Sequence, residues 1–185
     1  MAFLSLITIL LNLFSRINCD KTIYWSENYK LRYDDFRKKS PDNSINNGWS
    51  VTGLNCSYSY NIDSINFEII SYFIKDESWL KLKDSLTLNH EQRHFDIAEL
   101  NSRMLNQKIS NLFKNDINKL KLGNHIDSLI NLCQNTCIND HDLYDNSVND
   151  SLNNAGQILW NKKIDSCLIS SRPFMSKKLV FYFKN

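Results

Sequence analysis

The sequence predicts an α+β fold, in which a small and mostly antiparallel N-terminal sheet packs on one long helix and two more helices follow. The sheet is indicated by runs of β-branched and aromatic residues between residues 20 and 84. The long helix is indicated by apolar residues at three- and four-residue spacing from Ile97 to Phe113. The same spacing returns over residues 116–139 and 143–165, which predicts the two later helices.

The predicted strands are separated by turn-forming segments. Residues 23–26 open the region, residues 51–62 alternate, and residues 67–74 are rich in β-branched and aromatic side chains. A turn-rich patch covers residues 38–48. The tail over residues 178–183 also has strand character, and the sequence leaves open whether it joins the sheet or packs on the helices.

Residues 1–19 have the pattern of a signal peptide. The apolar run from Phe3 to Phe14 has the length of a signal-peptide core and is too short to span a bilayer. We expect cleavage after Cys19, export to the periplasm, the outer membrane or the medium, and a single domain over residues 20–185. The alternatives are a lipid anchor on Cys19 and an N-terminal core or anchor helix. No other stretch of the sequence is apolar enough to cross a membrane.

Charge and cysteine content narrow the class of protein. The net charge is +2 with both signs mixed along the chain, so a nucleic-acid partner is not expected. Four cysteines follow the predicted signal peptide: Cys56, Cys133, Cys137 and Cys167. In an exported protein, disulfides that join Cys133 or Cys137 to Cys56 or Cys167 are expected, with buried free thiols as the alternative.

The long helix begins with the motif His90-Glu91-x-x-His94. Residues four apart on a helix share one face, so both imidazoles can bind the same metal ion. Glu91 is displaced by one residue, which suits a general base beside a metal-activated water. The pattern therefore predicts a zinc hydrolase, and Asp84 or Ser85 is expected to cap this helix. The alternative is a helix that carries two surface histidines without a metal.

A catalytic zinc ion has three protein ligands and one open position, so a third ligand is needed. Asp96 and Glu99 point away from the face that His90 and His94 share, and Asp96 is better placed to pair with Arg93 or Arg103. We therefore expect the ligand to come from a later segment. The candidates there, chosen by the chemistry of their side chains, are His125, His141, Asp145 and Asp150.

Several motifs resemble a bacterial family catalogued as domain of unknown function 922, whose members are described as secreted zinc-dependent proteases. Residues 90–100 read His-Glu-Gln-x-His-Phe-Asp-Ile-Ala-Glu-Leu, which is similar to the family's central motif. Looser similarities flank this motif on both sides. They are Trp25-Ser26, Leu31-x-Tyr33-x-Asp35-Phe36, Ser78-Trp79, Tyr144-Asp145 and Gln157-x-x-Trp160. The chain departs from the family pattern at Asp150, where the family has a histidine.

The resemblance implies a zincin-like metallopeptidase. It implies His90, His94 and Asp150 as zinc ligands, with His141 as the second choice for the third position and a solvated Asp150 as the alternative. Glu91 would act as general base for a zinc-activated water, and Tyr144 would polarise the substrate carbonyl. A peptide or protein is the expected substrate. The rival interpretation is a catalytically inactive secreted binding module of the same fold.

Overall fold

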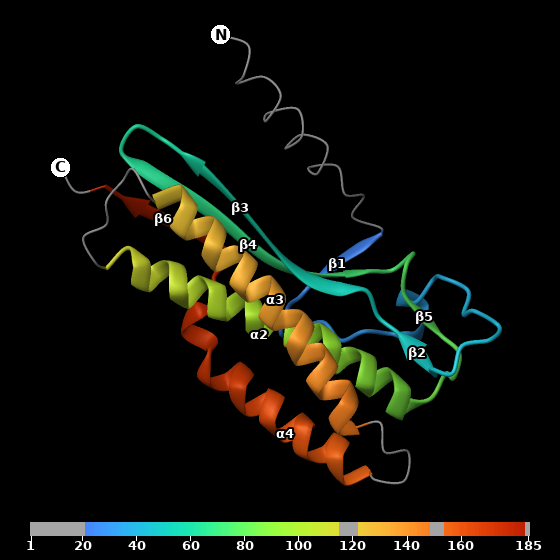
Figure 1. Ribbon diagram of the computed structural model, residues 1–185. Helices are drawn as coiled ribbons and strands as arrows, with labels where there is room; N and C mark the ends of the chain where they lie inside the picture. Colours follow the sequence, from blue (N-terminus) through green and yellow to red (C-terminus); the bar gives the residue numbers. More distant parts are fainter. Residues whose placement is uncertain (1–20, 115–121, 149–153, 184–185) are drawn as a thin grey trace.

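The computed structural model describes residues 21–114, 122–148 and 154–183 of the chain. It confirms an α+β architecture with a small antiparallel sheet and three helices (Figure 1). The strands are β1 (Thr22–Tyr24), β2 (Gly48–Trp49), β3 (Thr52–Tyr60), β4 (Ser64–Ile74), β5 (Trp79–Leu80) and β6 (Lys178–Tyr182). The helices are α2 (Ser85–Leu112), α3 (Leu122–Val148) and α4 (Asn154–Ser170), with short 3₁₀ turns at Tyr33–Asp35 and Arg172–Phe174. The predicted signal peptide and Cys19 lie outside the described residues.

Strand β4 is the centre of the main sheet. β3 pairs with it in antiparallel register along one edge, from Thr52↔Phe73 to Tyr60↔Ile65. The other edge of β4 holds β1 at one end and β6 at the other, both antiparallel. The C-terminal tail therefore joins the sheet, which settles the question that its sequence left open.

Strands β2 and β5 form a separate two-stranded sheet, in which Gly48 faces Leu80 and Trp49 faces Trp79. Antiparallel pairing directs the backbone groups of alternate residues to the same neighbour. The carbonyl of Asn47 accepts a hydrogen bond from the amide of Lys81 on the β5 side. The backbone groups of Gly48 and Ser50 therefore point to the opposite edge of β2.

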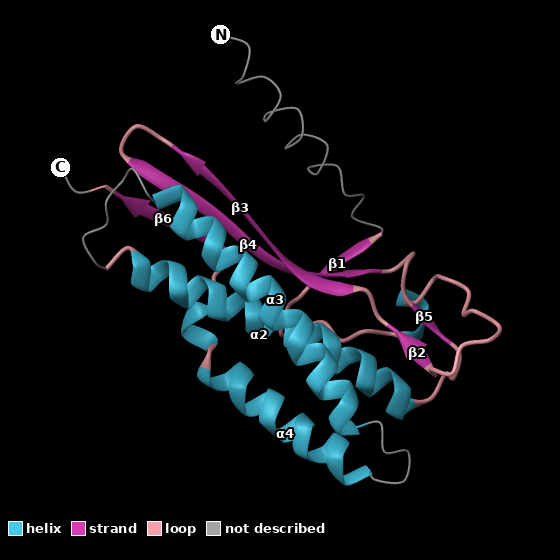
Figure 2. Ribbon diagram, viewed as in Figure 1, coloured by secondary structure: helices cyan, strands magenta, loops and turns pink. Residues whose placement is uncertain are grey.

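α2 and α3 pack against one face of the main sheet, and α4 packs on these two helices (Figure 2). α2 contacts β3 and β4 as well as α3 and α4, so it is buried along most of its length. One apolar cluster joins the sheet, α2 and α3, and includes Ile65, Phe67, Leu105, Ile109 and Ile126. A smaller cluster of Ile97, Tyr144 and Ile164 joins the three helices. Burial of these side chains provides the main driving force for the helix packing.

The start of α2 agrees with the sequence prediction. Asp84 is the N-cap residue, and its carboxylate accepts a hydrogen bond from the amide of Thr87 at 2.7 Å. The cap places His90 and His94 in the second and third turns, inside regular helix.

The later helices differ from the prediction. The sequence predicted a break between residues 139 and 143, but α3 runs unbroken through this segment to Val148. Residues 139–142 are polar and contain neither Gly nor Pro, so helix can continue where tertiary contacts satisfy the side chains. Asp140 accepts a hydrogen bond from Asn101 at 2.9 Å, and His141 contacts His94. The unbroken helix moves Tyr144 and Val148 from the predicted last helix into α3.

Two further sequence questions concern the thiols and the membrane. Cys56, Cys133, Cys137 and Cys167 are all free in this structure, so the expected disulfides are not formed. Cys133 and Cys137 match the alternative of buried thiols, whereas Cys56 and Cys167 are only partly buried. Within the described residues, no helix is both long enough and apolar enough to cross a membrane.

A buried ion pair anchors α2 to its surroundings. Arg103 donates to Glu99 at 2.7 Å, with side chains that are 1% and 4% exposed. Arg103 also donates to the carbonyl of Leu168 at 2.7 Å, and Ser71 of β4 donates to Glu99 at 2.6 Å. Because every partner lies on a different element, this pair joins α2 to α4 and to the sheet.

We predict that Arg103→Met lowers the free energy of unfolding by about 3–5 kcal/mol, because it leaves Glu99 buried without its cation. Urea denaturation measures the change. The control is Arg172→Met, which removes an exposed pair with Glu27 whose side chains are 60% and 39% exposed, and its expected cost is below about 1 kcal/mol. A similar loss in both variants would contradict the role assigned to the buried pair.

Candidate metal centre

The two histidines of the motif face each other on α2. His90 Nε2 and His94 Nε2 are 3.2 Å apart, and the ring centroids are 4.9 Å apart with the planes nearly perpendicular. His90 is partly buried and His94 is buried, and both line a groove between α2, α3 and the segment around β2. The sequence prediction that one face of α2 presents both imidazoles is therefore confirmed.

α3 brings a carboxylate to the same point. Asp145 Oδ1 lies 3.2 Å from His90 Nε2 and 2.9 Å from His94 Nε2. In the described part of the chain, these three residues form the group whose side-chain atoms lie close enough to hold a metal ion. Two nitrogen donors and one oxygen donor are a ligand set that zinc accepts.

His90 Nε2, His94 Nε2 and Asp145 Oδ1 form a triangle, here called the ligand triangle. Its size and its hydrogen bonding both fit a metal ion. A tetrahedral ion with bonds of about 2.0–2.1 Å holds its ligands roughly 3.3 Å apart, and the three edges here measure 3.2, 3.2 and 2.9 Å. Asp145 Oδ1 is buried and makes no hydrogen bond of acceptable geometry, although both nitrogens lie within reach. A cation at the centre of the triangle would satisfy this oxygen.

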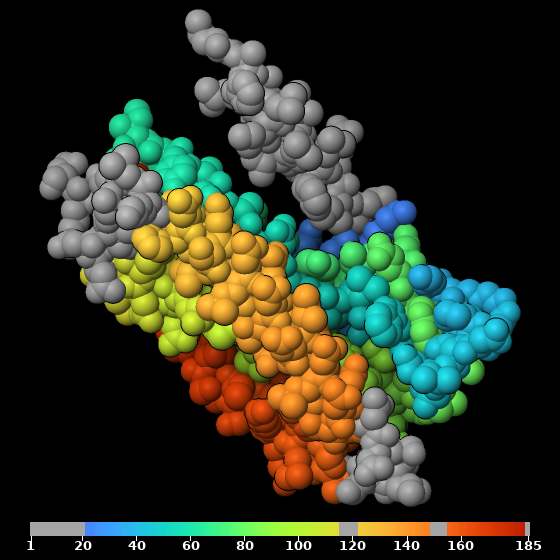
Figure 3. All heavy atoms as spheres, in the orientation of Figure 1, coloured from blue at the N-terminus to red at the C-terminus, as the bar shows by residue number. Residues whose placement is uncertain are grey.

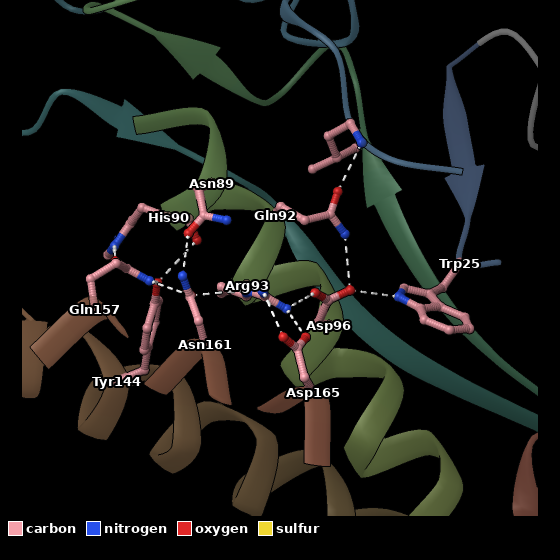
Figure 4. A network of polar contacts seen from close by, with 11 residues as sticks. Trp25, Asn89, His90, Gln92, Arg93, Asp96, Tyr144, Gln157, Asn161 and Asp165 are labelled. Atoms are coloured by element: carbon pink, nitrogen blue, oxygen red, sulfur yellow. Dashed lines mark hydrogen bonds and ion pairs between the residues drawn. The ribbon is translucent and has the colours of Figure 1, made fainter. Parts of the chain in front are cut away.

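His90 is held from outside by α4 and α3. His90 Nδ1 lies 3.4 Å from Gln157 Oε1, so it can donate there and leave Nε2 free to bind metal. Gln157 also donates to the Tyr144 hydroxyl at 2.7 Å, and the Tyr144 ring stacks on His90 with centroids 4.9 Å apart. Figure 4 shows Gln157 between His90 and Tyr144, and Asn161 between Gln157 and Arg93.

His94 is held by a second chain of contacts on α3. Its Nδ1 lies 2.9 Å from His141 Nδ1, and His141 Nε2 lies 3.4 Å from Cys137 Sγ. Burial, reinforced by the neighbouring His94, lowers the pKa of His141 to about 3, so this ring is neutral. A neutral His141 can accept a hydrogen bond from His94 Nδ1. This arrangement leaves His94 Nε2, which lies 2.9 Å from Asp145 Oδ1, free to bind metal.

Asp145 and His90 shift each other's pKa values toward the charged forms. Burial acts to raise the pKa of Asp145, but its contacts with His90 and His94 outweigh burial and hold the pKa well below its usual value. Burial acts to lower the pKa of His90, but Asp145 and Glu91 outweigh it and the net shift is upward. An anionic carboxylate between two imidazoles is an environment that attracts a cation.

Glu91 lies beside the triangle without belonging to it. Its side chain is buried at 3% exposure, and its Oε2 has no hydrogen-bond partner. Burial raises the pKa of Glu91, and the two histidines only partly oppose this shift. Gly48 of β2 lies so close that a Cβ there would be 2.5 Å from Glu91 Oε1. A buried carboxylate oxygen without a hydrogen-bond partner costs about 1–3 kcal/mol of desolvation. Unsatisfied buried groups of this kind are found most often at functional sites.

The groove gives the centre access to solvent and room for a ligand. It has a volume of about 850 Å³ and is bounded by residues 45–52, by the start of α2 and by the end of α3. Figure 3 shows the cyan segment that contains β2 and the orange end of α3 on the same face of the molecule.

The remaining candidate residues take other positions. His141 contacts His94 and is not one of the three converging residues, and His125 is exposed near the far end of α3. As expected, Asp96 pairs with Arg93 at 3.0 Å. Asp150 lies outside the described residues, so its role as a ligand stays a prediction, and the structure places Asp145 at the site instead. Tyr144 is fully buried against His90, so in this structure it supports the ligand and does not face the groove.

Asp145 could have been identified as a ligand from the helical spacing of residues along α3. Cys137, His141 and Asp145 are spaced four residues apart, so an unbroken helix places them on one face. Sequence reasoning considered Asp145 without choosing it, because the resemblance to the bacterial family pointed to Asp150, where the family has a histidine. The predicted break near residue 140 also hid the shared face of Cys137, His141 and Asp145.

Comparison with known proteins returned no relative. No protein-family model, no curated protein and no solved structure matches the chain. The resemblance of residues 90–100 to the bacterial family thus remains a prediction, and the assignment of the site depends on its geometry.

We predict that the protein binds about one zinc ion per chain, as expected for a single three-ligand centre, and that Asp145→Asn and His94→Ala lose it. Asp142→Asn is the matched control, because Asp142 is one turn earlier on α3 and lines the same groove without joining the triangle. It should keep the metal. Elemental analysis after dialysis measures the ratio, and Asp150→Asn tests the residue chosen from sequence. Retention of zinc by Asp145→Asn would contradict the proposed ligand set.

We also predict that zinc affinity falls as the pH decreases, starting above the ordinary imidazole pKa of about 6.5. His90 has a raised pKa in the metal-free protein, so it carries a proton at a higher pH than usual and must release it to bind metal. Calorimetry in buffers of different ionisation enthalpy, at about pH 6 and about pH 8, should show more protons released at the lower value. The control His125→Ala should behave like wild type. Equal proton release at both values would contradict the raised pKa.

Proposed function

We propose that this protein is an exported, zincin-like metallopeptidase that hydrolyses peptide bonds. The observation that carries the proposal is the convergence of His90 Nε2, His94 Nε2 and Asp145 Oδ1 on one point, 2.9–3.2 Å from one another, at the wall of a groove. Two histidines and an aspartate would hold zinc and leave a fourth position toward the groove.

Zinc in such a centre polarises a carbonyl group and makes a water molecule more acidic. Glu91 lies beside the ligand triangle with one carboxylate oxygen unpartnered. From this position Glu91 would take a proton from the attacking water and pass it to the leaving amine. Its raised pKa suits the first transfer, because a carboxylate that binds protons more tightly accepts one from the water more readily.

β2 offers a place for an extended substrate. The backbone groups of Gly48 and Ser50 point away from β5, and both residues line the groove. A peptide that pairs with this edge would run across the ligand triangle, with main-chain hydrogen bonds that do not depend on its sequence. Gly48 allows the close approach of this edge to Glu91, since a side chain here would displace the carboxylate.

The preorganised ligands and the open position beside them favour a catalytic metal over a purely structural one. Gln157 and His141 hold the outer nitrogens of His90 and His94, which fixes the ligand nitrogens before the metal binds. The centre has three side-chain ligands and lies open to a groove of about 850 Å³, whereas a structural zinc site is closed by four protein ligands.

We predict that Glu91→Gln reduces kcat by about 10²–10⁴ while zinc content stays at the wild-type level, because the general base is lost and the ligands are not. Hydrolysis of a diverse peptide library, followed by mass spectrometry, measures activity beside elemental analysis of zinc. Glu68→Gln is the control, since Glu68 is exposed on β4 away from the groove, and it should retain full activity.

The rival function is an inactive binding module. If the zinc-loaded wild type cleaves no peptide, and Glu91→Gln changes nothing, the metallopeptidase proposal fails and the rival stands. If the wild type and Glu91→Gln cleave peptides at the same rate, a general-base role for Glu91 is excluded.

A further inference from the structure

The rim of the groove exposes an unusual amount of apolar surface. Four large aliphatic or aromatic side chains line it and remain well exposed: Ile45 (96%), Trp49 (51%), Leu86 (60%) and Ile138 (59%). They belong to the loop before β2, to β2, to the start of α2 and to α3, so they flank the ligand triangle on both sides. Apolar side chains that gather around a polar centre mark a binding surface more often than isolated ones do.

The charged side chains that line the groove are all acidic. Within residues 21–114, 122–148 and 154–183 its lining includes no lysine and no arginine, although the whole chain has 22 of them. Its acidic members are Glu91, Asp142 and Asp145, and Asp142 is exposed at the rim. A free carboxylate is most often recognised by a fixed cationic side chain, usually arginine. Apart from the metal itself, which the scissile carbonyl would occupy, the described lining offers no cation to bind the C-terminus of a peptide or an acidic side chain.

We propose that the groove takes an internal stretch of extended polypeptide with large apolar side chains beside the scissile bond, and that it rejects carboxylates there. This inference rests on the proposed peptidase function and names its substrate class. The protein would act within chains and not at their C-terminal ends. Segments of this composition are buried in folded proteins, so its substrates would be unfolded or flexible chains.

The same apolar rim resembles a membrane-contact surface, but two observations favour a peptide. The open edge of β2 offers backbone hydrogen bonds, for which an extended peptide is the natural partner. Asp142 at the rim would repel anionic lipid headgroups, and the described lining lacks the basic residues that attract them.

The first experiment compares three quenched fluorescent peptides with the zinc-loaded protein. One is blocked at both ends with Leu and Phe at its centre, one has Asp in both central places, and one keeps the apolar residues but ends in a free carboxylate directly after them. The blocked apolar peptide should have kcat/KM at least about 10-fold above the other two, the scale that pocket contacts of this kind supply. Equal rates for all three would overturn the inference and leave the peptidase function standing.

The second experiment uses matched isoleucines. Ile138→Lys and Ile45→Lys place a cation in the rim, whereas Ile169→Lys on α4 and Ile62→Lys in the β3–β4 turn alter isoleucines of similar exposure elsewhere, at 63% and 104%. The two rim variants should lose at least about 10-fold on the apolar peptide and gain on the Asp peptide, as charge complementarity requires. The two controls should match wild type. Identical behaviour of all four variants would overturn the inference.

A binding measurement separates the inference from turnover. Fluorescence anisotropy with the labelled apolar peptide and the Glu91→Gln protein should give a Kd that Ile138→Lys weakens and Ile169→Lys does not. Absence of both cleavage and binding would reject the proposed function and the inference together. Binding to neutral phospholipid vesicles that Ile138→Lys abolishes, without peptide binding, would overturn the inference in favour of a membrane surface.

Discussion

The packing of α3 against α2 is the constraint on which the candidate site depends. α2 alone supplies two imidazoles on one face, and they become a three-ligand centre only where α3 presents Asp145 within 3.2 Å of both. The side chains that fix this helix pair are buried around the centre. Tyr144 and Ile97 pack between the helices, and Cys137 and Ile126 continue the contact toward the sheet. The ligand distances therefore follow from the fit of an apolar interface, where displacement costs packing energy.

Buried polar contacts add orientation to this packing. Asp96 accepts hydrogen bonds from Trp25 at 2.8 Å and from Gln92 at 2.9 Å, and Gln92 in turn accepts from the amide of Leu31 at 2.8 Å. These contacts tie the metal-binding stretch of α2 to the N-terminal segment, as Figure 4 shows for Trp25, Gln92 and Asp96. Each buried group has a directional partner, so rotation of α2 about its axis would break several hydrogen bonds at once. The histidines are thereby held in one direction.

The contrast between the two carboxylates near the histidines follows from their environments. Asp145 lies between two imidazoles, which stabilise its charge and keep its pKa low. Glu91 is more deeply buried and lacks a partner for one oxygen, so its pKa is raised. Such a division suits one carboxylate that binds a cation and another that exchanges protons. The motif by itself does not specify this difference, because it depends on α3 and on the approach of Gly48.

The sequence by itself determined the α+β class, the capped start of α2 and the shared face of His90 and His94, because all three depend on local periodicity and on one capping residue. It also separated Asp96 and Glu99 from the metal, since helix geometry directs them to other faces. Only the tertiary structure decided that α3 continues past residue 140 and that Asp145 meets the histidines. Local preference for a break in a polar stretch was overridden by Asn101 and His94, which contact that stretch from another helix. Long-range contacts of this kind leave no periodic signal in a single sequence, so the third ligand and the groove emerge only from the packed helices.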